Sequence, residues 1–243
     1  MDRLLFTATA GAQRVLQLQA GRANNLANVD TPGFRADMEL VATQTIGNQG
    51  LATRAFPVLM GQSVSLAQGD AVPTGRDLDL AIADRGFFAV QGAEGEAYTR
   101  TGSLSIDNGG TLLLNGRQVI GQEGPLVLPP YQDIMVGDDG NVSVIPADGG
   151  AALEVGMLKL VNPDNAVLRK GIDGLIRSVD GAPLPAATQV KVLSGFLEGS
   201  NVDAFGEMTA SMDLNRQFEV QVKMMQSAER LSKVGNSLLD NVQ

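Results

Sequence analysis

The sequence predicts an α+β protein in which two long terminal helices, coiled-coil-like in their spacing, flank a β-rich central domain. All ten prolines lie between Pro32 and Pro185, and because proline disrupts helix interiors, both ends are open to long helices. Between the ends, short apolar runs alternate with glycine-rich turns, as in antiparallel sheets. We expect four segments: an N-terminal helical segment at 1–35, a connector at 36–77, a β-rich domain at 78–192 and a C-terminal helical segment at 193–243.

The first helix is expected from about Asp2 to Asn28. Apolar or small residues recur there every three or four positions, in a narrow stripe like the seam of a coiled coil. The stripe consists of Leu4, Ala8, Gly11, Val15, Leu18, Arg22 and Leu26. The helix should end before Pro32, because the residue preceding a proline is driven toward extended backbone and Gly33 permits a turn.

The last helix is expected from about Ala204 to Asn241, with Asn201 or Asp203 as its N-cap. Its stripe contains Met208, Met212, Phe218, Val222, Met225, Ala228, Leu231, Val234 and Leu238. About 38 residues at 1.5 Å each give a length of roughly 57 Å. That exceeds the depth of an ordinary core, so we expect partners outside the chain to cover part of this helix.

The middle of the chain is expected to be built from short strands. Alternating and apolar runs predict strands at 78–82 and 87–90, and glycine-rich turns at 106–111 and 137–142 predict hairpins. Further strands are expected at 112–114, 142–145, 157–161 and 190–193. Residues 36–77, rich in Gln, Thr and Ala, read as a mixed connector.

Composition excludes several functions. The chain has no Cys and no His, which removes thiolate nucleophiles, imidazole bases and the commonest zinc ligands. We therefore predict no catalytic residues, no cofactor and no metal. A net charge of −9 argues against nucleic acid as a partner. No apolar stretch approaches the roughly 18 residues of a membrane helix, and the N-terminus lacks the features of a secretory signal, so we expect no membrane insertion and no cleaved signal.

The acidity is concentrated in the middle of the chain. Residues 1–35 carry a net charge of +2, residues 203–243 carry −2, and residues 36–202 carry −9. Surfaces that stay in water are usually charged, whereas the centres of protein contacts are depleted in charge. The two ends are therefore the expected contact surfaces.

Two carboxylate pairs raise the alternative of catalysis. Asp77 and Asp79 share a face if the chain is extended there, as an acidic hydrolase would need. The chain has no Trp and only two Tyr, so an aromatic platform for a sugar is missing. Asp138 and Asp139 precede Gly140 and Asn141, and we interpret them as a turn.

Three separated stretches carry a family resemblance. Residues 23–34 read ANNLANVDTPGF, residues 197–202 read LEGSNV, and residues 98–102 read YTRTG after GFF at 86–88. In this order and spacing they resemble the flagellar rod and hook family, over essentially the whole chain. Within it, the chain most resembles proximal-rod subunits, because of TPGFR at 31–35, RQFE at 216–219 and its modest length.

The resemblance implies a structural subunit that transmits torque, polymerising through its terminal helices in the periplasmic rod of the flagellar basal body. Its implied partners are other rod subunits, itself, and the flagellar type III export apparatus. The residues expected at subunit contacts are Leu4, Val15, Leu18, Asn24, Asn25, Leu26, Asn28, Thr31, Pro32, Gly33 and Phe34 near the N-terminus, and Met208, Met212, Arg216, Phe218, Val222, Met225, Leu231 and Leu238 near the C-terminus. Amides such as Asn24 would fix register between packed helices.

Two alternatives remain open at this point. The chain could be a distal-rod or hook-type subunit of the same family. In a different class, it could be a monomeric secreted binding module whose terminal helices pack on its own β domain. Compact, fully protected helices in a monomer would favour the binding module.

Overall fold

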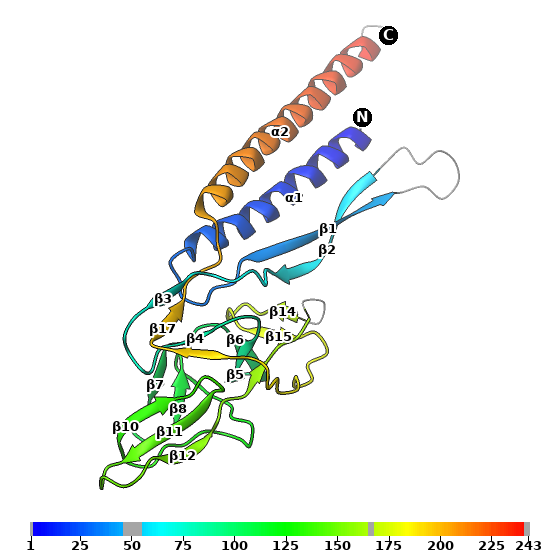
Figure 1. Ribbon diagram of the computed structural model, residues 1–243. Coiled ribbons are helices and arrows are strands. Elements are labelled where there is room, and N and C mark those ends of the chain that lie inside the picture. Colours follow the sequence, from blue (N-terminus) through cyan, green and yellow to red (C-terminus); the bar gives the residue numbers. More distant parts are fainter. Residues whose placement is uncertain (1, 46–54, 165–167, 241–243) are drawn as a thin grey trace. The chain divides into compact units, whose positions relative to one another are not determined.

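The computed structural model describes residues 2–45, 55–164 and 168–240 (Figure 1). The chain divides into two compact units. Met1–Ala27 and Asp203–Gln243 form the first, which we call the helical unit, and Asn28–Val202 form the second, the β unit. The order helix, strands, helix confirms the predicted α+β class.

The helical unit consists of α1 (Asp2–Ala27) and α2 (Ala204–Asp240), which run antiparallel. Arg22, near the end of α1, bonds to Glu207 at the start of α2, whereas Thr9 reaches Met225 much further along α2. Asp203 caps α2, since its Oδ1 accepts a hydrogen bond of 3.1 Å from the Phe205 N–H. Of the two predicted N-caps, Asp203 is therefore the one in use.

The two helices meet through a mixture of small and branched side chains. Ala8, Ala12 and Val15 of α1 are buried, as are Leu214 and Ala228 of α2. Alanines at a contact let two helix backbones approach closely, so burial here depends on shape as well as apolar area. Neither helix is long and apolar enough to cross a membrane over the portion described.

The β unit is built from small antiparallel sheets. The largest has the order β13-β5-β6-β15-β14, with bounds Leu160–Val161, Phe87–Gly92, Gly95–Thr99, Ile176–Ser178 and Leu168–Lys170. Two three-stranded sheets are β7 (Leu104–Ile106), β8 (Leu112–Leu114) and β9 (Arg117–Gln118), and β10 (Tyr131–Val136), β11 (Asn141–Pro146) and β12 (Leu153–Met157). Three pairs complete the unit: β1 (Asp37–Thr45) with β2 (Ala55–Val64), β3 (Ala71–Pro73) with β17 (Phe196–Glu198), and β4 (Leu80–Ile82) with β16 (Val192–Ser194).

Strand β5 separates two apolar cores. Phe88 and Val90 belong to the larger core, with residues of β4, β7, β8, β11 and β16. Phe87 and Ala89 face the smaller core, which contains Tyr98. Because successive side chains of a strand point to opposite faces, a strand buried on both sides reads as the continuous apolar run that FFAV provides.

The connector interpretation missed a hairpin. Residues 36–77 contain β1 and β2, which pair along their whole length from Asp37 with Val64 to Thr45 with Ala55. The register shifts between Leu40 and Val41, and a bulge breaks the two-residue alternation on which strand prediction depends. The expected strand at 157–161 is likewise divided, since β12 ends at Met157 and β13 begins at Leu160.

Candidate functional site

On α1, the residues expected at subunit contacts occupy different environments. Val15 is buried at 5% exposure in the helical unit, and Leu18 and Leu26 are half-buried. Asn24 is exposed. The side chain of Leu4 lies outside the described part of the chain.

On α2 the predicted stripe divides between two faces. Phe218, Val222 and Met225 are half-buried. Met208, Met212 and Leu231 are instead 47%, 62% and 60% exposed, which leaves large apolar side chains in water. The side chain of Leu238 is outside the described residues.

Arg216 is also exposed on α2. Its side chain is 80% exposed and pairs with Asp213 at 3.7 Å, one turn earlier on the same helix. An exposed pair of this kind contributes only a few tenths of a kcal/mol, so Arg216 adds little to the stability of the helix.

A buried carboxylate joins the two helices near the start of α2. Both oxygens of Glu207 accept hydrogen bonds of 3.1 Å from Arg22 Nη1, and Oε1 accepts one of 2.9 Å from Asn25 Nδ2. Gln19 and Asn215 add a further bond of 3.0 Å between the helices. Asn25, expected at a contact between subunits, is thus 1% exposed and bonded within one molecule.

The three motif stretches named above converge at one place in the β unit, which we call the motif junction. Gly33 N–H donates to the Glu198 carbonyl at 2.7 Å, and Thr101 Oγ1 donates to the Pro32 carbonyl at 3.3 Å. The motif junction therefore brings together the segments that follow α1 and precede α2. Thr31 and Pro32 are exposed on it, whereas Gly33 is buried.

Gly33 is required by the closeness of this contact. Its φ of +71° favours glycine. A Cβ there would lie 2.3 Å from the backbone nitrogen of Thr101, a distance at which backbone would have to move.

An ion-pair triad lies at the centre of the motif junction. Glu198 Oε1 accepts from Arg35 Nη2 at 2.6 Å, and Oε2 accepts from Arg100 Nη1 at 2.7 Å. The three side chains are between 1% and 2% exposed. Arg35 directly follows the first motif stretch, Arg100 lies in the stretch at 98–102 and Glu198 lies in the stretch at 197–202, so one carboxylate holds all three together.

Two further donors of the triad are directed to backbone oxygens, whereas Arg35 Nε and Arg100 Nε are buried and have no hydrogen-bond partner among the described residues. Arg35 Nη1 donates to the Ala67 carbonyl, and Arg100 Nη2 donates to the Asp84 carbonyl at 2.5 Å. Glu198 Oε1 also accepts from the Gly69 N–H at 2.9 Å. Such bonds offset part of the cost of removing charges from water.

Burial controls the electrostatics of both arginines. It lowers the pKa of Arg35, although the Glu198 carboxylate acts in the opposite direction. For Arg100, burial lowers the pKa to about 10, again against the attraction of Glu198 and with a further lowering by Arg35. Both guanidinium groups stay charged at neutral pH, so two cations share one buried anion.

Two further residues of the motifs, Asn201 and Phe34, make contacts at the edges of the motif junction. Asn201 Nδ2 donates to the Ala67 carbonyl at 2.7 Å, and its Oδ1 accepts from the Ala36 N–H at 2.7 Å. The ammonium group of Lys170 lies over the half-buried ring of Phe34, 3.6 Å from the ring centroid, in a cation–π contact. At the turn after α1, Asn28 Oδ1 accepts from Thr31 Oγ1 at 3.2 Å.

Arg35, Arg100 and Glu198 were not among the expected contact residues, although each lies in or beside a quoted motif. A charged residue inside an otherwise apolar or glycine-rich motif was the available signal. It does not reveal which partner each charge takes.

The two carboxylate pairs lie in different structural settings. Asp79 is 5% exposed and pairs with Arg76 at 3.4 Å. Asp138 and Asp139 lie in the turn between β10 and β11, as predicted, with Asn141 N–H donating to Asp139 Oδ1. Among the residues with described positions, no group of three or more potential ligands could hold a metal ion.

Comparison with known proteins gives a consistent result. Residues 193–238 match the family model of the flagellar basal body rod FlgEFG protein C-terminal region, and residues 81–144 match that of the flagellar hook protein FlgE/F/G D1 domain. The chain is 36% identical to the flagellar basal-body rod protein FlgF of Escherichia coli (strain K12), over 98% of this chain and 99% of the relative. It is 33% identical to FlgF of Caulobacter vibrioides, covering 96% of each. With the flagellar basal-body rod protein FlgG of Bacillus subtilis (strain 168) the identity is 28%, over 95% and 97%.

Proposed function

Since the chain belongs to the family of flagellar basal-body rod proteins, we propose that it is a structural subunit of the rod that transmits torque and assembles through its helical unit. One observation carries the proposal from the residues themselves. The helical unit has seven acidic and seven basic side chains, whereas the β unit has twenty acidic and eleven basic ones. The helical unit therefore has no net charge. Together with the exposed apolar residues of the helices, this suits burial against other subunits.

Several large apolar side chains support assembly through the helices. Phe205 is 84% exposed and Phe6 is 69% exposed, and each would remove a large apolar area from water on contact. A single exposed apolar residue is ordinary, but six large apolar side chains are exposed on the 37-residue helix α2: Phe205, Met208, Met212, Val220, Leu231 and Val234. We infer that neighbouring subunits cover them, with coiled-coil-like packing between helices.

The motif junction supports a second part of the proposal. It holds the segment after α1 and the segment before α2 on one buried carboxylate, so a load on either helix reaches the same point of the β unit. We propose that this arrangement transmits torque between the helical unit and the β unit. The predicted contact residues Thr31 and Pro32 are exposed on the motif junction and are proposed to contact a neighbour.

Membership of the family supports proposals about location and partners. We propose a proximal position in the periplasmic part of the rod, contact with other rod subunits, and passage through the flagellar export apparatus. We also propose that the protein has no enzymatic activity. The buried and paired state of Asp79 supports this last point.

Complementation tests the proposal. Cells lacking the protein would receive either the full chain or residues 28–202 alone, and purified basal bodies would be assayed for the subunit alongside swimming. The full chain should restore both, whereas 28–202 should restore neither. A matched full chain carrying Glu154→Gln, an exposed change in the β unit, should behave as wild type. Restoration by 28–202 would refute assembly through the helices.

A further inference from the structure

A short segment near the end of the β unit holds several earlier parts of that unit together. We call residues 190–201 the closing strap. It contains β16 and β17, which pair with β4 and β3 in two two-stranded sheets. In Figure 1 the strap is the yellow-to-orange ribbon that passes beside the blue-green β3 and β4. Both of these sheets therefore exist only when the strap is in place.

The backbone of the closing strap also bonds to segments that are far apart in the sequence. Its N–H groups donate at 2.8 Å to three carbonyls, from Gly199 to Asp70, from Gly195 to Asp79 and from Val192 to Asp138. Such nonlocal contacts form only after the intervening chain has been closed into a loop. The strap thus links segments that local contacts do not bring together.

The closing strap completes the larger apolar core. Val190 and Val192 are 3% and 1% exposed and belong to that core together with Leu80 and Ile82 of β4. Removal of the strap would leave β4 without its neighbouring strand and its buried side chains open to water. Burial of such side chains is a main source of folding free energy.

Glu198 of the closing strap is the counter-charge of the motif junction. The side chains of Arg35 and Arg100 are each 2% exposed and pair with it at 2.6 and 2.7 Å. In the part of the chain that the structure describes, neither arginine forms a second ion pair. Without the strap, folding of the earlier segments would bury two positive charges with no anion, which opposes folding strongly.

We propose that the closing strap is a folding gate: the segments before residue 190 do not assume the native structure of the β unit until the strap is present. A chain is synthesised from its N-terminus, so the β unit then folds in one step after residue 201 has become available, instead of in pieces. The proposal goes beyond the proposed function, since it concerns the folding of one molecule and is independent of contacts between subunits.

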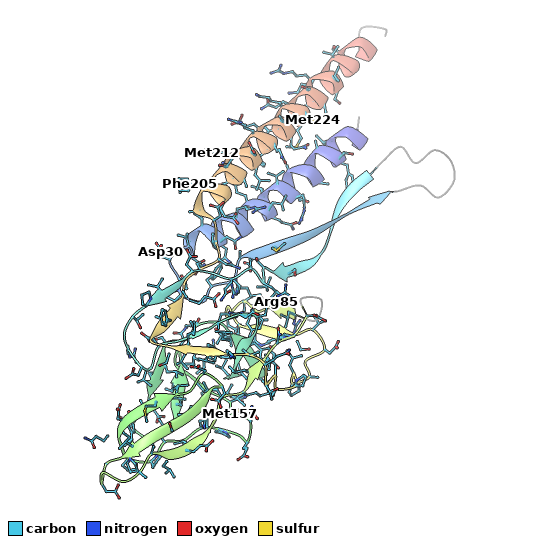
Figure 2. The ribbon with its side chains drawn as sticks, viewed as in Figure 1. Asp30, Arg85, Met157, Phe205, Met212 and Met224 are labelled. Carbon is cyan, nitrogen blue, oxygen red and sulfur yellow. The ribbon has the colours of Figure 1, made fainter. Side chains whose placement is uncertain are left out.

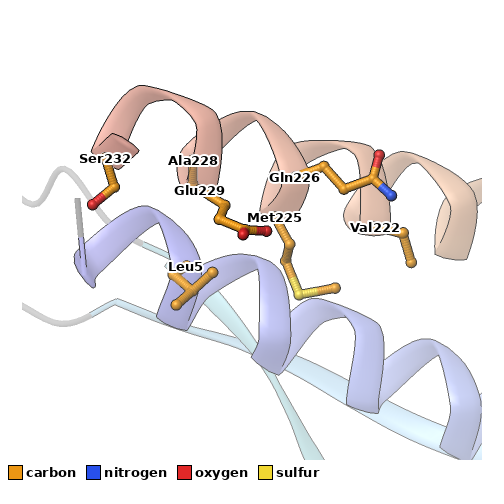
Figure 3. A pocket seen from close by; sticks show the side chains of 7 residues that line it. All are labelled: Leu5, Val222, Met225, Gln226, Ala228, Glu229 and Ser232. Atoms are coloured by element: carbon orange, nitrogen blue, oxygen red, sulfur yellow. The ribbon is translucent and has the colours of Figure 1, made fainter. Parts of the chain in front are cut away.

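The helical unit lies outside this gate but affects how the gate is tested. Its helices meet through side chains that include those around the apolar groove of Figure 3, and none of these belongs to the strap: Leu5, Val222, Met225 and Ala228. The strap precedes α2 in the sequence, and Figure 2 shows Phe205 on the first turn of that helix. Truncation before the strap therefore also removes α2, so the measured signal must come from the β unit alone.

The tyrosines provide such a signal. The chain has no Trp, and its two tyrosines, Tyr98 and Tyr131, both belong to the β unit. Tyr98 is 1% exposed. Near-ultraviolet circular dichroism of the tyrosines is lost when fixed side-chain packing is lost, so it reports the native structure of the β unit.

The experiment starts from the full-length chain. A protease site is inserted between Thr188 and Gln189, two exposed residues of a turn, and the folded protein is cleaved there. After separation in denaturant, residues 1–188 are returned to native buffer alone, with residues 189–243, or with a synthetic peptide of residues 189–202. We expect no native tyrosine signal and no cooperative unfolding from residues 1–188 alone, and recovery of both with either partner. Uncleaved protein taken through the same denaturant cycle is the control for the insertion.

Variant peptides test the buried charge. The Glu198→Gln peptide should bind residues 1–188 about 100-fold more weakly than the wild-type peptide, because a buried ion pair loses one partner. In the matched control, Lys191→Gln, an exposed charge of the strap is removed instead. Its affinity should stay within about threefold of wild type.

Three outcomes would overturn the proposal. The first is a native tyrosine signal with cooperative unfolding in residues 1–188 alone. The second is recovery with residues 189–243 but not with the peptide, which would place the gate in α2. The third is equal affinity of the Glu198→Gln and wild-type peptides, which would refute the buried charges as its cause. Residues 28–202 keep the strap, so the complementation result for that fragment bears on assembly and not on the gate.

Discussion

The motif junction depends on a single buried carboxylate, so Glu198→Gln should destabilise the β unit severely. The substitution keeps the shape of the side chain but leaves Arg35 and Arg100 without a counter-charge. At the position of Oε2, 2.7 Å from Arg100 Nη1, the amide could place a donor against a donor. Removing one partner of a buried ion pair costs about 3–5 kcal/mol, and because Glu198 is 1% exposed, solvent screening gives little relief.

Calorimetry can measure this effect on the full chain. For a unit of this size, 1 kcal/mol corresponds to a shift of about 2–4 °C in Tm, so the transition of the β unit should fall by roughly 10 °C. Glu94→Gln is the matched control, because Glu94 is 76% exposed and lies 3.9 Å from Arg177. That change should alter stability by less than about 0.5 kcal/mol. A loss below about 1 kcal/mol for Glu198→Gln would refute the reasoning.

A triple variant separates the charge from the shape of the site. Buried ion pairs can often be replaced by apolar residues of similar volume without loss of stability. Arg35→Met, Arg100→Met and Glu198→Leu together should therefore recover most of the stability that Glu198→Gln loses. The Ala67 carbonyl would keep its bond from Asn201. If the triple variant is less stable than Glu198→Gln, the cost lies in packing and backbone bonds and not in the unpaired charges.

Three other predictions concern single side chains. Gly33→Ala should cost several kcal/mol in the β-unit transition, since its Cβ would meet the Thr101 backbone at 2.3 Å. Burial raises the pKa of the Tyr98 hydroxyl, so the folded state keeps this proton above pH 10 and the stability should fall as the pH rises from there. Tyr98→Phe should be about 1 kcal/mol less stable than wild type at pH 7. It should lose less stability between pH 9 and 11, as measured by denaturant titrations. Asp203→Ala removes the N-cap and should cost about 1 kcal/mol, measured as faster amide hydrogen exchange in the first turn of α2.

Each of these has an outcome that contradicts it. A Gly33→Ala protein as stable as wild type would mean that the backbone at the motif junction can shift freely. An unchanged alkaline slope in Tyr98→Phe would assign the loss of stability to other groups. Protection at the start of α2 that survives Asp203→Ala would show that the Glu207 contacts hold the helix end without the cap.

The two helices could be predicted from the sequence because their signals are local. Proline is missing from both ends, and apolar residues repeat at helical spacing. α1 ends one residue before its predicted end and α2 begins at its predicted start, whereas the predicted end of α2, Asn241, lies outside the described residues. The face of α2 that packs inward was harder to predict. Apolar residues occupy several sides of this helix, and Leu214, absent from the predicted stripe, is buried at 8% exposure while Met212 is exposed.

The motif junction could not be predicted in the same way. Arg35 and Glu198 are separated by 163 positions and Arg100 and Glu198 by 98, so no periodicity connects them. The quoted motifs identified the three stretches, but their convergence on one carboxylate is a property of the fold. The β1–β2 hairpin was missed for a different reason, because its bulge interrupts the alternation that marks a strand.

The hydrogen bond between Gly33 and Glu198 joins the segment that follows α1 to the segment that precedes α2. The residues from Phe34 to Leu197 lie between the two residues that this hydrogen bond of 2.7 Å joins. An insertion with adjacent ends can grow, shrink or be exchanged without displacing the segments on either side. The β unit therefore behaves as an insertion between the two helices. Its size can differ between relatives that keep both helices and the buried Glu198 ion pairs.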